Sequence, residues 1–197
     1  GELLAMVSTP AYDPNAFNTG ISARLWKSLL NHPRHPLINK AIAGQYPPGS
    51  TFKPFMALAG LALGKRTPQY TISDPGHFSL PGLSHQYRDW KKGGHGAVDL
   101  HRSLVISCDT YYYGLATDLG IDAIHKYVSQ FGLGATTGID LPGEMPGILP
   151  SSAWKMQRYR QKWFAGDTVS VGIGQGYNIA TPLQLAHATG VLAANGK

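Results

Sequence analysis

The chain contains 197 residues, of which 43% are hydrophobic and 14% are charged, and its formal net charge is +6. This apolar content is enough for the core of one globular domain, which we expect to span residues 1–197. No apolar stretch reaches the length of about 18 residues that a membrane-spanning helix needs. The basic residues are scattered and lack an RNA-binding signature, so the positive charge does not indicate a nucleic-acid partner.

The first third of the chain combines one expected strand with one expected helix. Leu3–Ser8 is a short apolar run that ends before Pro10, which predicts a strand leading into a loop. Apolar side chains spread around more than one face of the segment Thr51–Leu63, which predicts a largely buried helix. Pro54 fits that helix because it falls in the first turn, where its missing N–H group is not needed.

The middle of the chain is rich in turn-forming residues. The segment Thr67–Gly96 holds three prolines and several glycines, so we expect an extended loop with short strands, of the kind that often carries function. Four further helical patterns follow, at Leu100–Ile106, Thr110–Leu119, Ala123–Phe131 and Pro182–Ala194. Helices outnumber strands, and the sequence predicts a loop-rich α/β fold.

A serine and a lysine lie three residues apart at the beginning of the first expected helix. Ser50 and Lys53 project from the same face, where a hydroxyl and an amine can share a proton. Serine is a poor nucleophile unless a base removes its proton, and an apolar environment favours the neutral, basic form of a lysine. The N–H groups at the helix N-terminus would stabilise the oxyanion formed when Ser50 attacks a carbonyl group.

Two nucleotide-binding motifs can be compared with this chain, and neither fits. Gly44–Thr51 has the glycine spacing of a phosphate-binding loop, but Ser50 stands where that loop requires lysine. The glycines of Gly172–Gly176 have the wrong spacing for a dinucleotide-binding loop, and no βαβ pattern accompanies them. We expect this second segment to form a tight turn that leads to the helix beginning at Pro182.

A second serine motif, Ser107-Cys108-Asp109, lies between two expected helices. In penicillin-recognising enzymes a serine-x-x-lysine motif is accompanied by serine-aspartate-asparagine. Here Asp109 stands in place of the asparagine. Ser107 alone could equally well cap the following helix, but its combination with Ser50 and Lys53 favours a catalytic role.

Longer motifs extend this resemblance over nearly the whole chain, which resembles a class B penicillin-binding protein of the elongation type, penicillin-binding protein 2. The segments that carry the resemblance are PGSTFKP (Pro48–Pro54), YRDWKKGGHG (Tyr87–Gly96), GIDLP (Gly138–Pro142), GDTVSVGIGQG (Gly166–Gly176) and TPLQ (Thr181–Gln184). The resemblance implies a penicillin-recognising serine transpeptidase fold of the α+β type, in which a helical cluster packs on an antiparallel sheet.

The resemblance also implies the activity of a peptidoglycan DD-transpeptidase. Ser50 would attack the D-alanyl-D-alanine bond of a stem peptide, release D-alanine and pass the acyl group to an amine on a neighbouring stem peptide. β-Lactams would acylate the same serine. Lys53 would take the proton of Ser50, and Ser107 would relay a proton to the leaving amine. Asp109 would orient Lys53 or the substrate amide, although the family has asparagine at this position.

The third family motif, lysine-threonine-glycine on a strand that lines the site, is absent from this sequence. The only late lysine is Lys197, so we expect the chain to stop before the C-terminal strands. By resemblance, the partners of the whole protein are peptidoglycan stem peptides, a membrane glycan polymerase and rod-shape-determining scaffold proteins. The expected location is the periplasmic face of the bacterial inner membrane.

Two other functions remain open for an acylated serine. A DD-carboxypeptidase or serine β-lactamase hydrolyses the acyl-enzyme with water, but no glutamate is obviously placed to activate that water. Glu144 lies in a turn-rich stretch and Glu2 lies at the start of the chain. A non-catalytic penicillin-sensor domain would keep the acyl group and signal to a partner.

Four residues are of types that can together bind zinc, namely Asp74, Asp89, His95 and Cys108. Their spacing is wide and irregular, so they could instead be two turn aspartates, a loop histidine and a small packed cysteine. Since Cys108 is the only cysteine, it cannot form an internal disulfide. Some members of the resembled branch carry a structural zinc next to the active site, and the resemblance therefore implies such a zinc here.

Overall fold

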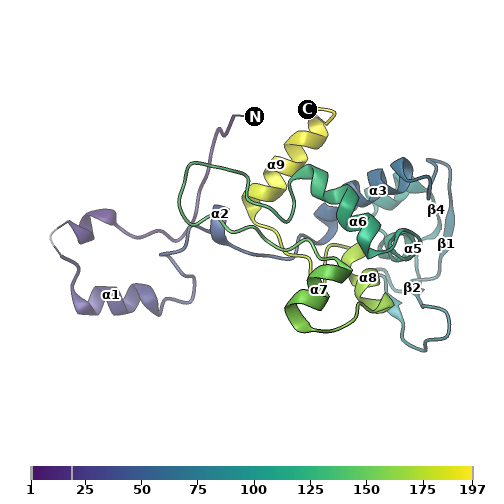
Figure 1. Cartoon of the computed structure of the whole chain (residues 1–197), viewed down its shortest axis with the longest axis horizontal. Helices are drawn as coiled ribbons and strands as arrows, with labels where there is room; N and C mark the ends of the chain where they lie inside the picture. Colours follow the sequence, from purple (N-terminus) through teal and green to yellow (C-terminus); the bar gives the residue numbers. More distant parts are fainter. Residues whose placement is uncertain (1, 19, 197) are drawn as a thin grey trace.

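The computed structural model describes residues 2–18 and 20–196, so that Lys197 lies outside the described residues. A cluster of helices occupies its centre (Figure 1). The α-helices are α1 (Ala23–Leu30), α2 (Lys40–Ala43), α3 (Lys53–Ala62), α4 (Leu100–Val105), α5 (Asp109–Leu119), α6 (Ile121–Val128), α7 (Ser152–Tyr159), α8 (Ala165–Gly172) and α9 (Pro182–Ala193). Three 3-10 turns accompany them, η1 (Pro14–Phe17), η2 (Gly49–Phe52) and η3 (Ser129–Phe131).

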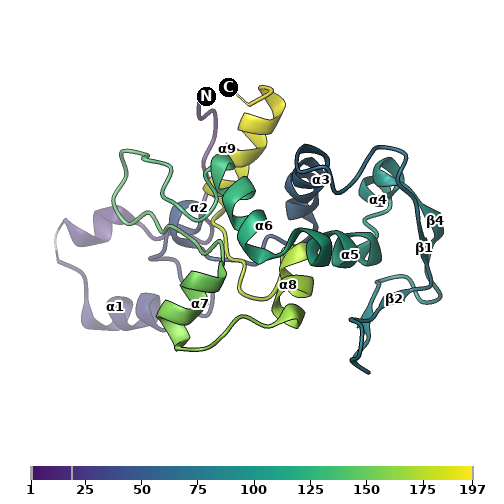
Figure 2. The ribbon, with the colours of Figure 1, turned by 45° about the vertical axis from the view of Figure 1, so that its right-hand side comes forward.

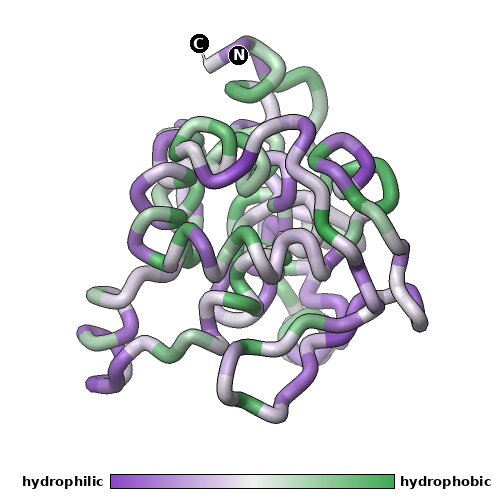
Figure 3. The backbone as a smooth tube through the Cα atoms, turned by 90° about the vertical axis from the view of Figure 1, so that its right-hand side faces the viewer, coloured by the Kyte–Doolittle hydropathy of each residue, from purple (hydrophilic) through white to green (hydrophobic). Residues whose placement is uncertain are grey.

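Helix α5 forms the middle of the hydrophobic core. Its residues Tyr111, Tyr112 and Leu115 are fully buried, and the helix packs against α3, α6 and α8 (Figure 2). The approach of α8 to α5 depends on Gly172, because a Cβ at this position would lie 2.6 Å from Ala116 Cβ. Hydrophobic and hydrophilic residues alternate along the helical coils in Figure 3, as expected of helices that cover a core with one face.

Two short antiparallel sheets lie in the segment that was expected to be a loop with short strands, and they confirm that prediction. Strand β1 (Ile72–Asp74) pairs with β4 (Gly96–Val98), with Asp74 opposite Gly96. Strand β2 (His77–Phe78) pairs with β3 (Tyr87–Arg88). The first pairing brings Asp74, at the end of β1, beside His95, the residue that precedes β4.

The predicted helices are confirmed, with small shifts at their ends. The expected helix at residues 51–63 is η2 followed by α3, and the four later patterns correspond to α4, α5, α6 with η3, and α9. Pro54 occupies the first turn of α3, as predicted. The mixed fold class of helices with antiparallel strands is also confirmed.

The strand predicted at Leu3–Ser8 is wrong. The structure gives these residues no regular secondary structure, and no other described segment pairs with them as a strand. Leu4 and Val7 are 86% and 77% exposed. A strand needs a hydrogen-bonding neighbour, so a short apolar run alone does not produce one.

Four helices were not predicted, namely α1, α2, α7 and α8. Helix α1 belongs to a lobe that stands apart from the helical cluster in Figure 1, and none of its residues is buried. Within the described residues, no helix combines the length and the apolar character needed to cross a membrane.

Candidate active site

Ser50 is an exposed residue in η2, immediately before α3. The turn is tied to a distant segment, because the Gly49 amide donates a hydrogen bond to the Gly174 carbonyl at 2.8 Å. Gly174 has a φ of +70°, and a Cβ there would clash with the Gly49 backbone. The predicted tight turn at residues 172–176 thus has a definite task, which is to support the turn that carries Ser50.

Lys53 is the first residue of α3 and is only 1% exposed. Its Nζ atom donates to Ser107 O at 2.8 Å, to Ser107 Oγ at 3.0 Å and to Asp109 Oδ1 at 2.6 Å. These three acceptors match the three protons of an ammonium group. The three predicted partners, Lys53, Ser107 and Asp109, therefore meet in one hydrogen-bonded network around the buried Lys53 side chain.

The hydroxyl of Ser107 stands between Lys53 and Ser50. Ser107 Oγ lies 2.8 Å from Ser50 Oγ and 3.0 Å from Lys53 Nζ. The sequence predicts that Ser50 and Lys53 share a proton directly, whereas the hydrogen-bonded path between them in the structure runs through Ser107. The helical spacing predicts that the two side chains share a face, but it cannot predict a hydroxyl inserted from another part of the chain.

Ser107 adopts a backbone conformation that is unusual for a residue with a side chain. It lies in the turn between α4 and α5 with a φ of +53°, in the left-handed region, where such strain is stored most often at functional sites. Two hydrogen bonds brace the turn. Lys53 Nζ donates to the Ser107 carbonyl, and Trp90 Nε1 donates to the Ile106 carbonyl at 3.1 Å.

An open cavity of about 650 Å³ lies in front of Ser50. Its polar lining residues are Ser50, Ser107, Asp109 and Gln175, and its apolar ones are Trp90, Val105, Ile106 and Ile173. Sequence reasoning predicted the first three of these as site residues and missed the others. The only signal for Trp90 was its place beside Asp89 within the motif YRDWKKGGHG, where an aromatic residue is surrounded by charged ones.

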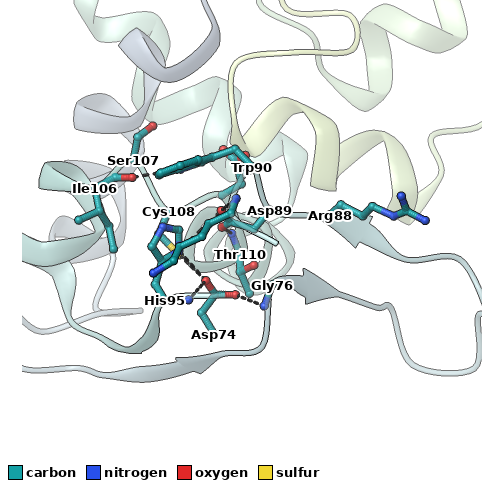
Figure 4. Close-up of polar contacts among 12 residues, drawn as sticks. Asp74, Gly76, Arg88, Asp89, Trp90, His95, Ile106, Ser107, Cys108 and Thr110 are labelled. Carbon is teal, nitrogen blue, oxygen red and sulfur yellow. Dashed lines mark hydrogen bonds and ion pairs between the residues drawn. The ribbon is translucent and has the colours of Figure 1, made fainter. Parts of the chain in front are cut away.

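The four predicted zinc ligands converge in one cluster (Figure 4), next to Trp90, whose ring packs against that of His95. One ligand atom of each residue lies within 4.8 Å of the others, and all four residues are buried: Asp74, Asp89, His95 and Cys108. His95 Nδ1 lies 2.7 Å from Asp74 Oδ2 and 3.6 Å from Asp89 Oδ1. The antiparallel pairing of β1 with β4 places His95 beside Asp74, while Cys108 reaches the cluster from the N-cap of α5.

The charges of this cluster favour a bound cation. Among the described residues, Asp74 and Asp89 have no lysine or arginine partner, and their only ion-pair contact is the His95 ring. His95 Nε2 is buried without a hydrogen-bond partner in the described part of the chain. Buried carboxylates are normally paired or coordinated to a metal. These residues could therefore hold a metal ion, with donors of the kinds that zinc accepts.

The protonation of the cluster depends on what occupies it. Burial opposes ionisation of Asp74, but hydrogen bonds led by that from the Gly76 amide outweigh it and lower the pKa of this carboxyl group. Burial, with smaller contributions from the two carboxylates, raises the pKa of the Cys108 thiol to about 12. Without a cation the thiol stays protonated, and a metal ion would bind it as the thiolate.

Comparison with known proteins places this geometry in a family. Residues 1–197 match the penicillin-binding protein transpeptidase domain. The peptidoglycan D,D-transpeptidase MrdA of Acinetobacter baumannii is 51% identical over 196 residues, which cover 100% of this chain but 29% of that relative. The chain thus spans less than a third of the length of this curated relative.

Solved structures give the same result. Pseudomonas aeruginosa PBP2, in complex with WCK 5153, is 48% identical with a TM-score of 0.95, over 100% of this chain and 43% of that one. Helicobacter pylori PBP2, in complex with MreC, is 39% identical with a TM-score of 0.94, over 99% of this chain and 36% of that one. A ceftriaxone acyl-enzyme of penicillin-binding protein A from Mycobacterium tuberculosis is 29% identical with a TM-score of 0.85, over 100% of this chain and 43% of that one. This chain belongs to the family of penicillin-binding protein transpeptidase domains.

Proposed function

We propose that this chain forms the acylating part of a peptidoglycan D,D-transpeptidase with Ser50 as the nucleophile. The proposal is carried by the hydrogen-bonded path from Lys53 through Ser107 to Ser50, which opens into the cavity. A nucleophile, a buried basic side chain and a bridging hydroxyl are groups that acyl transfer through a serine ester uses. The assignment of Lys53, Ser107 and Asp109 to catalysis is part of the proposal.

In the first half-reaction, Ser50 Oγ attacks the carbonyl carbon of the D-alanyl-D-alanine peptide bond. Its proton moves to Ser107 Oγ, while the proton of Ser107 moves to the neutral amine of Lys53. When the C–N bond breaks, this proton returns through Ser107 to the leaving nitrogen. D-Alanine departs as an amine, and the acyl group remains on Ser50 as an ester.

Lys53 must be neutral when it accepts this proton, and Asp109 is placed to make that possible. The Lys53 Nζ to Asp109 Oδ1 distance of 2.6 Å is that of a strong, charge-assisted hydrogen bond. A proton that moves along this contact to the carboxylate leaves a lone pair on the amine. We therefore assign two tasks to Asp109, which are to hold Lys53 beside Ser107 and to accept its extra proton.

In the second half-reaction, an amine of a neighbouring stem peptide attacks the ester carbonyl carbon. The C–O bond to Ser50 breaks, and Ser50 regains a proton that the attacking amine loses through Ser107 and Lys53. A β-lactam would acylate Ser50 by the first half-reaction, with opening of its ring. The ceftriaxone acyl-enzyme of the Mycobacterium tuberculosis relative supports this expectation.

We propose that Asp74, Asp89, His95 and Cys108 hold a zinc ion. The two carboxylates, imidazole and thiol are a donor set that suits zinc, and four protein ligands would close its coordination sphere. The ion would then neutralise the buried carboxylates and leave no position for a catalytic water. Cys108 lies between Ser107 and Asp109, so the cluster would hold the second serine motif in place.

The partners of the whole protein are proposed from its relatives. The complex of Helicobacter pylori PBP2 with MreC supports a scaffold partner of the rod-shape-determining kind. A membrane glycan polymerase, glycan strands with their stem peptides, and a location at the periplasmic face of the inner membrane follow from the same family.

Hydrolytic and non-catalytic alternatives are less well supported. Glu144 accepts hydrogen bonds from Thr137 N, Thr137 Oγ1 and Gly138 N, so its carboxylate already has partners within its own loop. No glutamate lines the cavity in front of Ser50 among the described residues. A hydrolase would need such a group to activate water. A penicillin sensor would be acylated but would form no cross-links.

Mass spectrometry of an intact protein that carries this chain tests the proposal. Exposure to benzylpenicillin should add one covalent adduct, and peptide mapping should place it on Ser50. The Ser50→Ala variant should remain unmodified, while Ser170→Ala, a change to another serine hydroxyl, should be labelled as the wild type is. An adduct on Ser107, or undiminished labelling of Ser50→Ala, would refute the assignment. A cross-linking assay with stem-peptide substrates then separates a transpeptidase from a sensor.

A further inference from the structure

Trp90 is a large aromatic side chain at the edge of the cavity in front of Ser50. Its side chain is 64% exposed, although it lines the same cavity as Ser50 and Ser107. Tryptophan offers much contact area, and large exposed apolar side chains in a cleft often mark the place of a ligand. None of the catalytic steps proposed above uses this ring.

The ring is fixed rather than free. Its Nε1 atom donates a hydrogen bond to the Ile106 carbonyl at 3.1 Å, and its centroid lies 5.2 Å from that of the His95 ring, with an angle of 61° between the planes. Figure 4 shows both neighbours beside the indole. A side chain that is already held in place loses little conformational entropy when a ligand packs against it.

The cavity is lined by reactive groups and by apolar ones. Ser50 and Ser107 line it together with Trp90, Ile173 and Val105, which is 69% exposed. A ligand whose carbonyl carbon meets Ser50 therefore has room beside it for an apolar group. Burial of that group against the indole would stabilise the bound ligand.

We propose that Trp90 is a specificity-determining residue that packs against the apolar part of the acyl donor beside the carbonyl group attacked by Ser50. The inference rests on the proposed acyl transfer at Ser50. On a peptide donor the apolar part is an aliphatic side chain on the acyl side of the scissile bond. On a β-lactam it is the side chain of the acylamino group.

Two β-lactams that differ only in this side chain test the inference on the intact protein. Benzylpenicillin carries a phenylacetyl group, and 6-aminopenicillanic acid has a free amine in its place. We expect Trp90→Ala to reduce the second-order acylation constant for benzylpenicillin about tenfold and that for 6-aminopenicillanic acid less than about threefold, since only the first compound loses an aromatic contact and its buried area. Trp90→Phe should keep most of the preference, because it keeps an aromatic face.

Trp26→Ala is the matched control, because Trp26 is a partly exposed tryptophan in the α1 lobe, and this variant should leave both constants unchanged. The ratio of the two constants within one variant does not depend on the fraction of folded protein. If Trp90→Ala does not fold, Trp90→Leu provides the same ratio without an aromatic ring.

A ratio of the two constants that is unchanged in the Trp90 variants would overturn the inference. Equal losses for both β-lactams would then show that the indole only supports the Ser107 turn through Ile106. Failure of the wild type to react with either compound would instead refute the proposed function.

Discussion

Asp109 stands where the serine-aspartate-asparagine motif of penicillin-recognising enzymes has asparagine, and a pair of substitutions can separate its charge from its hydrogen bond. Asp109→Asn keeps an oxygen that can accept from Lys53 Nζ, whereas Asp109→Ala leaves a buried ammonium proton without this acceptor. A lost hydrogen bond to a charged group costs about 1.5–3 kcal/mol. If orientation is the main task of Asp109, Asp109→Ala slows acylation at least about tenfold and Asp109→Asn less than about threefold.

The measurement is the rate of acylation by benzylpenicillin under single-turnover conditions. Equal, large losses in the two variants would contradict a role in orientation and would leave proton acceptance as the main task of Asp109. Retention of the wild-type rate by Asp109→Ala would remove this residue from the mechanism altogether.

At the scale of single residues, the sequence predicts the members of the site better than their connections. The spacing of Ser50 and Lys53 and the later Ser107-Cys108-Asp109 motif identify residues that the structure brings together. The bridging position of Ser107 was not predictable, because it depends on a left-handed turn between α4 and α5. Trp90 was missed because no local pattern distinguishes a ring that faces a cavity from one that faces solvent.

At the scale of elements, the packing of α8 on α5 can be tested through one glycine. Gly172→Ala would place a methyl group 2.6 Å from Ala116 Cβ and 2.7 Å from Tyr112 O. Overpacking of this kind costs about 1–3 kcal/mol, so we expect a lower free energy of unfolding in urea. Gly190→Ala in α9 is the control, since nothing lies within 4 Å of its added Cβ. That variant should be unchanged or slightly more stable. Equal stability of both variants would show that α8 can move away from α5 without cost.

The loop that contains Glu144 has a predictable pH dependence. Burial opposes ionisation, but hydrogen bonds from Thr137 and Gly138 hold the pKa of Glu144 below its usual value. A depressed pKa contributes stability above the unfolded-state value and loses it as the pH falls through the folded-state value. We expect Glu144→Gln to lower the melting temperature at pH 7, and this difference to shrink as the pH falls through the lowered folded-state pKa of Glu144, where the carboxylate becomes protonated in both states. A difference that does not change with pH would exclude this linkage.

The helices that the sequence predicts are those with continuous apolar content. Helices α3, α5 and α6 bury several apolar side chains each. Helix α8 has the sequence AGDTVSVG, whose glycines and β-branched residues are poor helix formers. It forms because Asp167 caps its first turn and because α5 covers one face. The segment Leu3–Ser8 shows the opposite: its apolar pattern predicts a strand, but no neighbouring strand pairs with it in the described residues.

At the scale of the whole molecule, the buried acidic cluster joins segments that are far apart in the chain. We expect protein purified without added metal to contain close to one equivalent of zinc by elemental analysis, since a tight structural site retains its ion. Cys108→Ser should lower the zinc content, the melting temperature and the acylation rate together. Ser103→Ala, another buried site near the turn, controls for packing, since it should keep the zinc. Less than about a tenth of an equivalent, with no change in melting on Cys108→Ser, would exclude the metal.

The sequence could predict which residues form this cluster but not that they come together. Wide, irregular spacing is also what unrelated loop residues produce, and the family resemblance was needed to favour a metal. Convergence requires the register of β1 with β4 and the burial of the turn before α5. Both are properties of the folded chain and not of any local segment.

The lobe that carries α1 is a suitable place to insert a label. None of the α1 residues is buried, and the lobe stands apart from the helical cluster in Figure 1. Exposed turns of this kind tolerate inserted sequence and are preferred sites of cleavage by proteases. An epitope or a fluorescent label inserted in the turn at residues 31–35 would report on the protein in living cells while leaving Ser50 and its cavity untouched.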